Sequence, residues 1–230
     1  MTRIKKILVM IRSIPNTVRF NFHYFPFNKA IHFPVLVSYK VSLRKLGKKG
    51  SLKCPNNFAS VKLGFSDGSY FMGTGKKSTF EHEIESQLSF QGSATMCNPF
   101  YLTIKHGAKI VIGDNFQSNT NFILNASKCI EIGKDSLIAW NVTILDGDGH
   151  FITNENNEEI LNYPKEIYIG NHNWIASGGT ILKGSILADN IIVSANAVIS
   201  GKFETPNIII GGVPAKVIKK DIAWKVDWIK

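Results

Sequence analysis

The chain has 230 residues, 44% hydrophobic and 19% charged, which is enough for one large globular domain and argues against a disordered chain. Its three cysteines are odd in number and far apart, so we expect no disulfide framework or zinc site, and a reducing compartment fits best. The net charge of +10 lies entirely in residues 1–66, which contain 13 Lys or Arg and no Asp or Glu.

No segment predicts a membrane span or a signal peptide. The longest early apolar run, Ile7 to Ile11, is closed by Arg12, whereas a spanning helix needs about 20 apolar residues. A signal peptide needs an apolar core of about 7–15 residues and a small-residue cleavage site, and neither is present. We therefore expect a cytoplasmic protein.

Residues 1–52 are predicted to be a basic, aromatic N-terminal extension. Residues 1–50 mix eleven cations with seven Phe or Tyr, a composition that suggests an anionic membrane surface or nucleic acid. We favour peripheral contact with an anionic membrane at its inner face, and we expect no nucleic acid partner. The alternative is that this segment caps the unpaired strand edge of the following domain.

A six-residue repeat dominates residues 53–212 and predicts an all-β fold, the left-handed parallel β-helix. Residues 58–110 contain Gly-punctuated β-type segments, which we interpret as irregular early coils. Apolar ladders at a step of six follow them, and this period fits neither a helix, near 3.6, nor a strand, at 2. The ladders are Ile112, Ser118 and Leu124; then Ile132, Ile138 and Ile144; then Ile169, Ile175, Ile181, Leu187, Val193 and Ile199.

In a triangular coil each hexad makes one strand and one turn, and each ladder residue stacks on its equivalent one coil away, at about 4.8 Å. The residue after the ladder position is small in most hexads, as at Gly170 and Ala176, which suits a tight corner. An ordinary β-sandwich with coincidental spacing is the alternative.

The ladder is interrupted twice. Between Leu124 and Ile132 the step is eight, so two residues bulge outward. Between Ile144 and Ile169 the hexads stop, and the polar stretch 146–166 must leave the coil as a loop. Loops on rigid repeat scaffolds often carry function.

Two prolines, Pro206 and Pro214, bracket a last strand at 207–210. We predict a short C-terminal helix in the tail, residues 213–230, because Trp224 and Trp228 have i, i+4 spacing.

The strongest candidate for chemistry is the run Asp146-Gly-Asp148-Gly-His150, where the coil opens into the loop. An imidazole there can serve as a general base, and a nearby carboxylate can fix its tautomer. A polar turn with an exposed histidine is the plain alternative. A metal site is a third interpretation, but no other His, Cys or Asp cluster completes it, and we expect no metal.

Several segments resemble bacterial hexapeptide-repeat acetyltransferases, and most of all the capsule and lipopolysaccharide O-acetyltransferases. Their active-site strand is similar to residues 140–150 (WNVTILDGDGH), and their next coil to residues 169–184 (IGNHNWIASGGTILKG). Residues 210–219 (IGGVPAKVIK) are similar to their coenzyme A segment, and residues 20–30 (FNFHYFPFNKA) to their start. The resemblance covers most of the chain and is weakest over residues 53–100.

The resemblance implies a homotrimer with three active sites at subunit interfaces and acetyl-CoA as co-substrate in the groove between neighbouring coils. It implies that His150 is the general base, oriented by Asp148 or, as second choice, by Asp146. The implied acceptor-binding residues are Trp140, Asn141 and Trp174. The implied coenzyme-binding residues are Ser177, Gly178 and Gly179, whose amides would stabilise an oxyanion, with Ala195, Pro214, Ala215, Lys216 and Lys219, the lysines meeting phosphates.

Each assignment has a structural alternative: Trp174 can cover a coil corner, the glycines can be turn residues only, and both lysines can be solvated. His106 and His172 are expected to be surface residues.

The leading hypothesis is an acetyl-CoA-dependent O-acetyltransferase acting on a sugar hydroxyl of a capsule, O-antigen or lipid-linked repeat. The alternatives are an N-acetyltransferase of an amino sugar nucleotide and a serine-type small-molecule acetyltransferase. A β-helix carbonic anhydrase is a remote alternative because it needs converging histidines, and a non-catalytic β-helix is the last.

Overall fold

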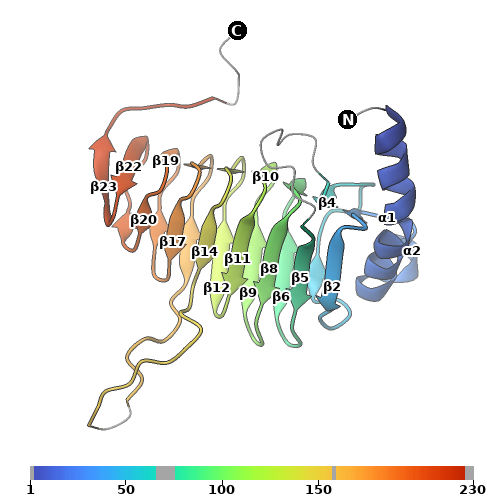
Figure 1. Cartoon of the computed structure of the whole chain (residues 1–230), viewed down its shortest axis with the longest axis horizontal. Coiled ribbons are helices and arrows are strands. Elements are labelled where there is room, and N and C mark those ends of the chain that lie inside the picture. The colour runs from blue at the N-terminus through green and yellow to red at the C-terminus, as the bar shows by residue number, and fades with distance from the viewer. Residues whose placement is uncertain (1–2, 66–75, 157–158, 226–230) are drawn as a thin grey trace.

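The computed structural model describes residues 3–65, 76–156 and 159–225. Two helices, α1 (Arg3–Tyr24) and α2 (Phe27–Ala30), precede a coil of short strands that forms three parallel sheets (Figure 1). Successive strands fall on successive sheets, so the chain passes each sheet once per coil. The predicted left-handed parallel β-helix is confirmed.

The strands of the three sheets follow one another in a fixed rotation. The first sheet contains β1 (Val35–Val37), β4 (Val61–Leu63), β7 (Ala94–Met96), β10 (Phe116–Ser118), β13 (Leu137–Ile138), β16 (Trp174–Ile175), β19 (Ile191–Val193), β22 (Ile208–Gly212) and β23 (Ala215–Lys219). The second contains β2 (Val41–Lys45), β5 (Ser78–His82), β8 (Phe100–Ile104), β11 (Phe122–Ala126), β14 (Thr143–Leu145), β17 (Thr180–Leu182) and β20 (Val198–Ile199). The third contains β3 (Leu52–Lys53), β6 (Gln87–Phe90), β9 (Lys109–Ile112), β12 (Cys129–Ile132), β15 (Ile167–Ile169), β18 (Ile186–Leu187) and β21 (Lys202–Phe203).

The predicted ladders form the core of the coil. Ile144 pairs in register with Ile181, and Ile181 with Ile199, and all three side chains are fully buried. The stretch 58–110 does form early coils, through β4 to β9, as expected. The tight corners are also as predicted: a Cβ on Gly133 would lie 2.6 Å from the carbonyl carbon of Gly170 one coil away. Small residues at this corner therefore let successive coils stack.

The coil begins earlier than the sequence predicts. Strands β1 and β2 and the first residue of β3 lie within 1–52, the range assigned to the extension, so the β-helix starts at Val35 rather than near 53. Val35 and Val41 keep the step of six, but the cations between and after them hide the pattern.

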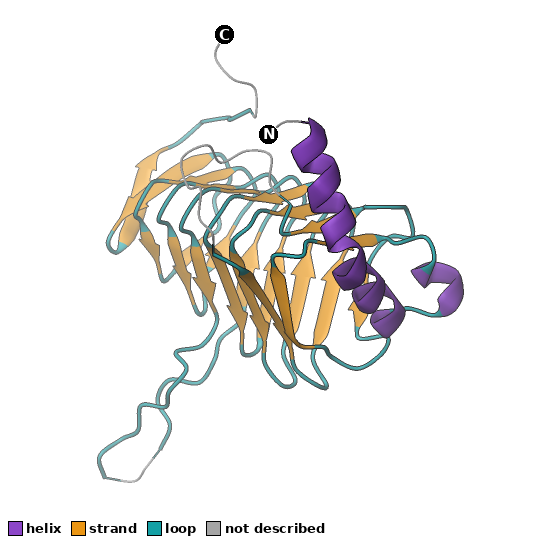
Figure 2. Cartoon of the chain, turned by 45° about the vertical axis from the view of Figure 1, so that its right-hand side comes forward, coloured by secondary structure: helices purple, strands orange, loops and turns teal. Residues whose placement is uncertain are grey.

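Helix α1 closes the N-terminal end of the coil by bonding to the edge strand β1 (Figure 2). The Asn21 side chain donates to the Val35 carbonyl at 2.7 Å and accepts from the Val35 amide at 3.2 Å. The Thr17 hydroxyl does the same at Val37, with distances of 3.2 and 3.0 Å. The edge groups of β1 are thus satisfied by side chains, which confirms the capping interpretation for α1.

The C-terminal end is closed by a strand, not by the predicted helix. Residues 215–219 form β23, which pairs antiparallel with β22, and 220–225 contain no helix. The helix prediction is therefore wrong for 215–225, while Trp228 lies outside the described residues. Pairing with β22 satisfies the last edge of the first sheet, which a helix would leave open.

Neither of the two described helices has the length and the apolar content needed to cross a bilayer.

A buried histidine connects α1 to the coil. His82 Nδ1 lies 2.8 Å from the Tyr24 hydroxyl, which also accepts from the Gly47 amide at 3.0 Å. Burial lowers the pKa of His82 below its ordinary value and is the largest influence on it. The imidazole is therefore held neutral in the folded chain.

This predicts a loss of stability in mild acid. Below pH about 6.5 the unfolded chain binds a proton at His82 that the folded chain resists, so the free energy of unfolding falls, by at most about 1.4 kcal/mol per pH unit. Urea unfolding from pH 7.5 to 5.5 should show this decline, and His82→Gln should flatten it. The control His106→Gln, at an exposed histidine, should keep the wild-type decline. Equal pH dependence in His82→Gln and wild type would contradict the assignment.

Candidate functional site

The predicted loop leaves the coil between β14 and β15, at the corner between the second and third sheets (Figure 1). We call this the loop corner: residues 146–166 with the turns 126–128 and 183–185 of the adjacent coils. The loop is a long excursion whose two limbs pair through a bridge between Thr153 and Ile160. The Leu161 amide also donates to the Ile152 carbonyl at 2.8 Å. The two described limbs of the loop, 146–156 and 159–166, are therefore joined to each other, and the first of them carries His150.

Asp146 is buried beneath the loop and holds the turn of the preceding coil. Its Oδ1 accepts from the Ser127 amide at 2.5 Å and its Oδ2 from the Lys128 amide at 2.8 Å. Burial raises the pKa of Asp146, and these backbone amides oppose that rise. Ser127 and Lys128 lie in the eight-residue step between Leu124 and Ile132, where two residues bulge outward. The Asp146 carboxylate fixes this bulge and therefore has a structural role.

Asp148 is exposed and takes part in a network at the base of the loop. Its Oδ2 accepts from the Lys183 ammonium and, at 2.7 Å, from the Asn162 amide. The pKa of Asp148 is lowered, mainly by the hydrogen bond from Lys183 and then by that from Asn162. Lys183 also donates to the Asn162 carbonyl at 3.0 Å, so the coil, the outgoing limb and the returning limb are joined.

Asn162 is the residue at this corner that sequence reasoning missed. Its side-chain amide donates to the carbonyl of His150 at 2.9 Å and its Oδ1 accepts from the Ile152 amide at 2.6 Å. It is one of several asparagines in a polar stretch, so nothing in the sequence singled it out. Lys183 was missed as well, although it lies in the next coil, which the resemblance covers.

The His150 side chain is exposed. Within the described residues its ring makes no hydrogen bond, so neither Asp148 nor Asp146 orients it in this chain as the sequence predicts. The physical reason is that Asp146 is used by the amides of the bulged turn and Asp148 by Lys183 and Asn162. The backbone that carries His150 is fixed instead, and its imidazole points to no partner in the described part of the chain.

The predicted oxyanion residues Ser177, Gly178 and Gly179 lie at a different corner, between the first and second sheets. We call it the asparagine corner: Asn121, Asn141, Gly178 and Asn196, all with positive φ. Asn121 donates to the Asn141 side chain at 2.8 Å. A Cβ on Gly178 would lie 2.1 Å from the Asn196 Oδ1, so glycine is required there. Asn141 is thus a member of a structural ladder as well as an exposed residue.

Backbone hydrogen bonds limit the predicted oxyanion site. The Gly178 amide donates to the Trp140 carbonyl at 2.9 Å, and the Gly179 amide to the Ala176 carbonyl at 3.2 Å. These two amides are committed to the coil, which corrects the prediction that all three would face a ligand. Among the described groups, the Ser177 amide makes no hydrogen bond and stays available for a ligand.

The remaining predicted residues lie on the first sheet and at the C-terminal end. Trp174 is 36% exposed and lies 6.0 Å from Trp224, whose ring stacks on His172 at 4.2 Å. The half-buried His172 is thus engaged by the tail rather than free on the surface. Pro214, Lys216 and Lys219 are exposed, Ala215 is half-buried, and Ala195 is exposed beside the asparagine corner.

One chain therefore does not bring its predicted site residues together. Asp146, Asp148 and His150 lie at the loop corner, whereas Trp140, Asn141 and Ser177 lie near the asparagine corner. In a triangular coil these are separate edges of the prism.

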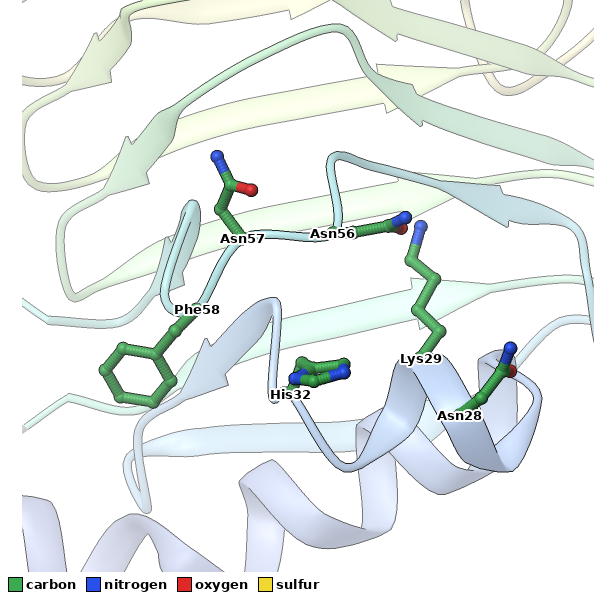
Figure 3. Close-up of a pocket in the computed structure, with 6 residues that line it drawn as sticks. All are labelled: Asn28, Lys29, His32, Asn56, Asn57 and Phe58. Carbon is green, nitrogen blue, oxygen red and sulfur yellow. The ribbon is translucent and has the colours of Figure 1, made fainter.

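A cavity of about 560 Å³ opens at the N-terminal end of the molecule (Figure 3). The residues that line it are Asn28, Lys29, His32, Asn56, Asn57 and Phe58. Lys29 and Asn56 point toward one another, while the Phe58 ring points away. None of the predicted site residues lines it. No group of three or more His, Cys, Asp or Glu among residues 3–65, 76–156 and 159–225 has the arrangement of a metal site.

Known proteins were compared with the chain. No family model matches it. It is 36% identical over 124 residues to the galactoside O-acetyltransferase of Escherichia coli (strain K12), a match of 53% of this chain and 58% of that protein. It is 32% identical over 119 residues to WbbJ of the same strain, which is named for O-acetyl transfer in lipopolysaccharide biosynthesis; this covers 48% of the chain and 60% of WbbJ. The chain thus spans less than two thirds of either relative.

Among solved structures, the polySia specific acetyltransferase NeuO superimposes with a TM-score of 0.57 and 18% identity. The match covers 81% of this chain and 83% of that one. At this identity it shows the fold alone, which is a β-helix. The homologues of the chain are galactoside and lipopolysaccharide O-acetyltransferases of the hexapeptide-repeat family, which confirms the resemblance stated from the sequence.

The two aspartates should respond differently to removal. Asp146→Ala should lower the free energy of unfolding by about 1–3 kcal/mol, because two part-buried amides lose their acceptor. Asp148→Ala should cost clearly less, since its carboxylate is exposed and water can take its place. Urea unfolding at pH 7.5 measures both. A larger loss for Asp148→Ala than for Asp146→Ala would contradict these roles.

Proposed function

We propose that this protein is an acetyl-CoA-dependent O-acetyltransferase that acts on a sugar hydroxyl of a bacterial surface polysaccharide, either a capsule, an O-antigen or a lipid-linked repeat. The observation that carries the proposal is an exposed His150, held on an ordered loop of a β-helix whose homologues are sugar O-acetyltransferases. The matched relatives bear names that refer to galactosides and to lipopolysaccharide, so a carbohydrate hydroxyl is the acceptor of choice.

The working unit in this proposal is a homotrimer with its sites between subunits. The separation of His150 from Ser177 on two corners supports it, because a second chain can place one corner against the other. Loop side chains such as Phe151 and Tyr163, 66% and 58% exposed, offer apolar area for such an interface.

His150 would take the proton from the acceptor hydroxyl, whose oxygen then attacks the acetyl carbonyl. A neutral imidazole is suited to this step, because one of its ring nitrogens can accept a proton. Asn162 and Lys183 would hold the loop backbone so that the ring stays at the site entrance. The imidazolium can then return the proton to the leaving thiolate.

The donor is acetyl-CoA, which would supply the thioester carbonyl. The open Ser177 amide fits the oxygen that becomes negative in the transition state. The exposed Lys216 and Lys219 on β23 fit the phosphates by charge, and Pro214 and Ala215 shape the turn before them. Trp140, Asn141 and Trp174 remain the proposed acceptor contacts.

Removal of the proposed base should abolish most of the transfer. His150→Ala should lower kcat by roughly 10²–10⁴, the usual contribution of a general base, with little change in the KM for acetyl-CoA. The measurement is thiol release from acetyl-CoA with galactosides, polysaccharide fragments, an amino sugar nucleotide and serine as acceptors. His106→Ala, at an exposed histidine of an earlier coil, should keep wild-type rates. Wild-type transfer by His150→Ala would remove it as the base, and turnover confined to an amine or to serine would overturn the sugar O-acetyl assignment.

Sites shared between subunits predict rescue by mixing. In this proposal each site combines the asparagine corner of one chain with the loop corner of another. Ala195→Trp should block the asparagine corner, whereas His150→Ala should inactivate the loop corner. Mixed trimers, made by unfolding and refolding both variants together, should regain a substantial fraction of wild-type activity because some interfaces contain two intact halves. No recovery in trimers shown to be mixed would place each site within one chain.

A further inference from the structure

Helix α1 has two faces of opposite character. One face is buried on the coil through Ser13, Thr17, Phe20, Asn21 and Tyr24. The other carries large apolar side chains that are exposed on the outside of the helix. They are Ile4 (71% exposed), Ile7 (52%), Leu8 (49%), Ile11 (56%), Ile14 (55%), Val18 (38%) and Phe22 (39%), and we call them the apolar stripe.

The apolar stripe is continuous. Its members recur at steps of three and four, so at about 100° per residue all of them fall within one side of the helix. Soluble monomers rarely expose contiguous apolar patches of this length without a function. The stripe continues at its end into Phe27, 72% exposed, whose ring lies 5.9 Å from that of Phe22. Figure 2 shows α1 as the outermost layer of this end of the molecule.

The charges beside the stripe are all positive. Lys5, Arg12 and Arg19 are exposed and fall along one flank of the stripe at the helical angle. No acid occurs in residues 1–66. Glu81 and Glu83, at the end of β5 and just after it, are paired with Lys45 at 3.5 and 2.7 Å. The exposed face of α1 is therefore apolar with a cationic border.

We propose that the apolar stripe docks the protein on an anionic lipid bilayer, with α1 lying flat in the interface. Apolar side chains would enter the boundary between headgroups and acyl chains, and the flanking cations would meet anionic headgroups. The helix is about 33 Å long at 1.5 Å per residue, but its cations prevent a crossing, in agreement with the absence of a membrane-spanning helix among the described residues.

The charge pattern favours lipid over a second copy of the chain. In helix pairing, the residues that flank the apolar seam usually carry complementary charges. Two copies of α1 would bring only cations to each other's flanks, so their borders would repel. An anionic membrane neutralises the same border and also accepts the aromatic end of the stripe. The inference does not depend on the proposed acetyl transfer, since binding can be measured without turnover.

The test is flotation of the full-length protein with vesicles of phosphatidylcholine alone or with one quarter phosphatidylglycerol. Wild type should float with the anionic vesicles, much less with the neutral ones, and less again at high salt. Ile7→Ser/Ile11→Ser and Arg12→Gln/Arg19→Gln should each reduce the partition coefficient roughly tenfold or more. The controls Ile84→Ser, at an equally exposed apolar residue, and Lys134→Gln/Lys202→Gln, with the same charge loss elsewhere, should float like wild type.

Thermal unfolding of each variant verifies that the fold is kept, as expected for exposed positions, and light scattering gives the oligomeric state. Equal flotation of Ile7→Ser/Ile11→Ser and wild type would overturn the proposal. A second result would also overturn it: wild type that does not float with the anionic vesicles, together with a smaller oligomer for Ile7→Ser/Ile11→Ser than for wild type. In that case α1 pairs with another copy of the chain.

Discussion

The stacking of equivalent residues in successive coils is the interaction on which the rest of this structure depends. Ile144, Ile181 and Ile199 follow one another in register, and neighbouring strands of a sheet lie about 4.8 Å apart. This spacing brings the corners into close contact, so Gly133 and Gly178 have no room for a side chain. The interior is consequently filled and closed. Any chemistry must therefore occur on the outside of the prism.

A stack of coils leaves an unpaired strand edge at each end, and this chain closes its two ends differently. At the start, Thr17 and Asn21 of α1 satisfy the edge of β1 with side-chain groups. At the end, β23 folds back and satisfies β22 with backbone groups. A helix used as a cap buries one face only. The other face of α1 is therefore free to carry a second property, and its residues are apolar with a cationic border rather than polar throughout.

The ladders, the corner glycines and the excursion at 146–166 could be predicted because each is a property of spacing along the chain. The early start at Val35 was missed because Lys40, Arg44 and Lys45 interrupt an apolar pattern whose inward members are still buried. The tail was misread because the i, i+4 spacing of Trp224 and Trp228 suggests a helix, whereas the open edge of β22 makes residues 215–219 a strand. The roles of Asp146 and Asp148 could not be read from spacing at all. The two carboxylates look alike in the sequence. They differ in the structure because Asp146 is buried beneath the loop and because their hydrogen-bond partners lie 14 to 35 residues away in the sequence.

The division of the candidate residues between two corners follows from the same geometry. A β-helix cannot bend one corner toward another, because every coil is fixed by the coils on both sides. A long excursion is the means by which such a rod can present a residue away from its own surface, and the network of Asp148, Asn162 and Lys183 gives that excursion a defined base. The loop places an imidazole outside the rod while the rod keeps a free amide at Ser177 on another edge. Two rigid copies in contact can complete a pocket that neither copy could form by moving. The reactive geometry would then be set by an interface, and its accuracy would rest on the stiffness of the ladder.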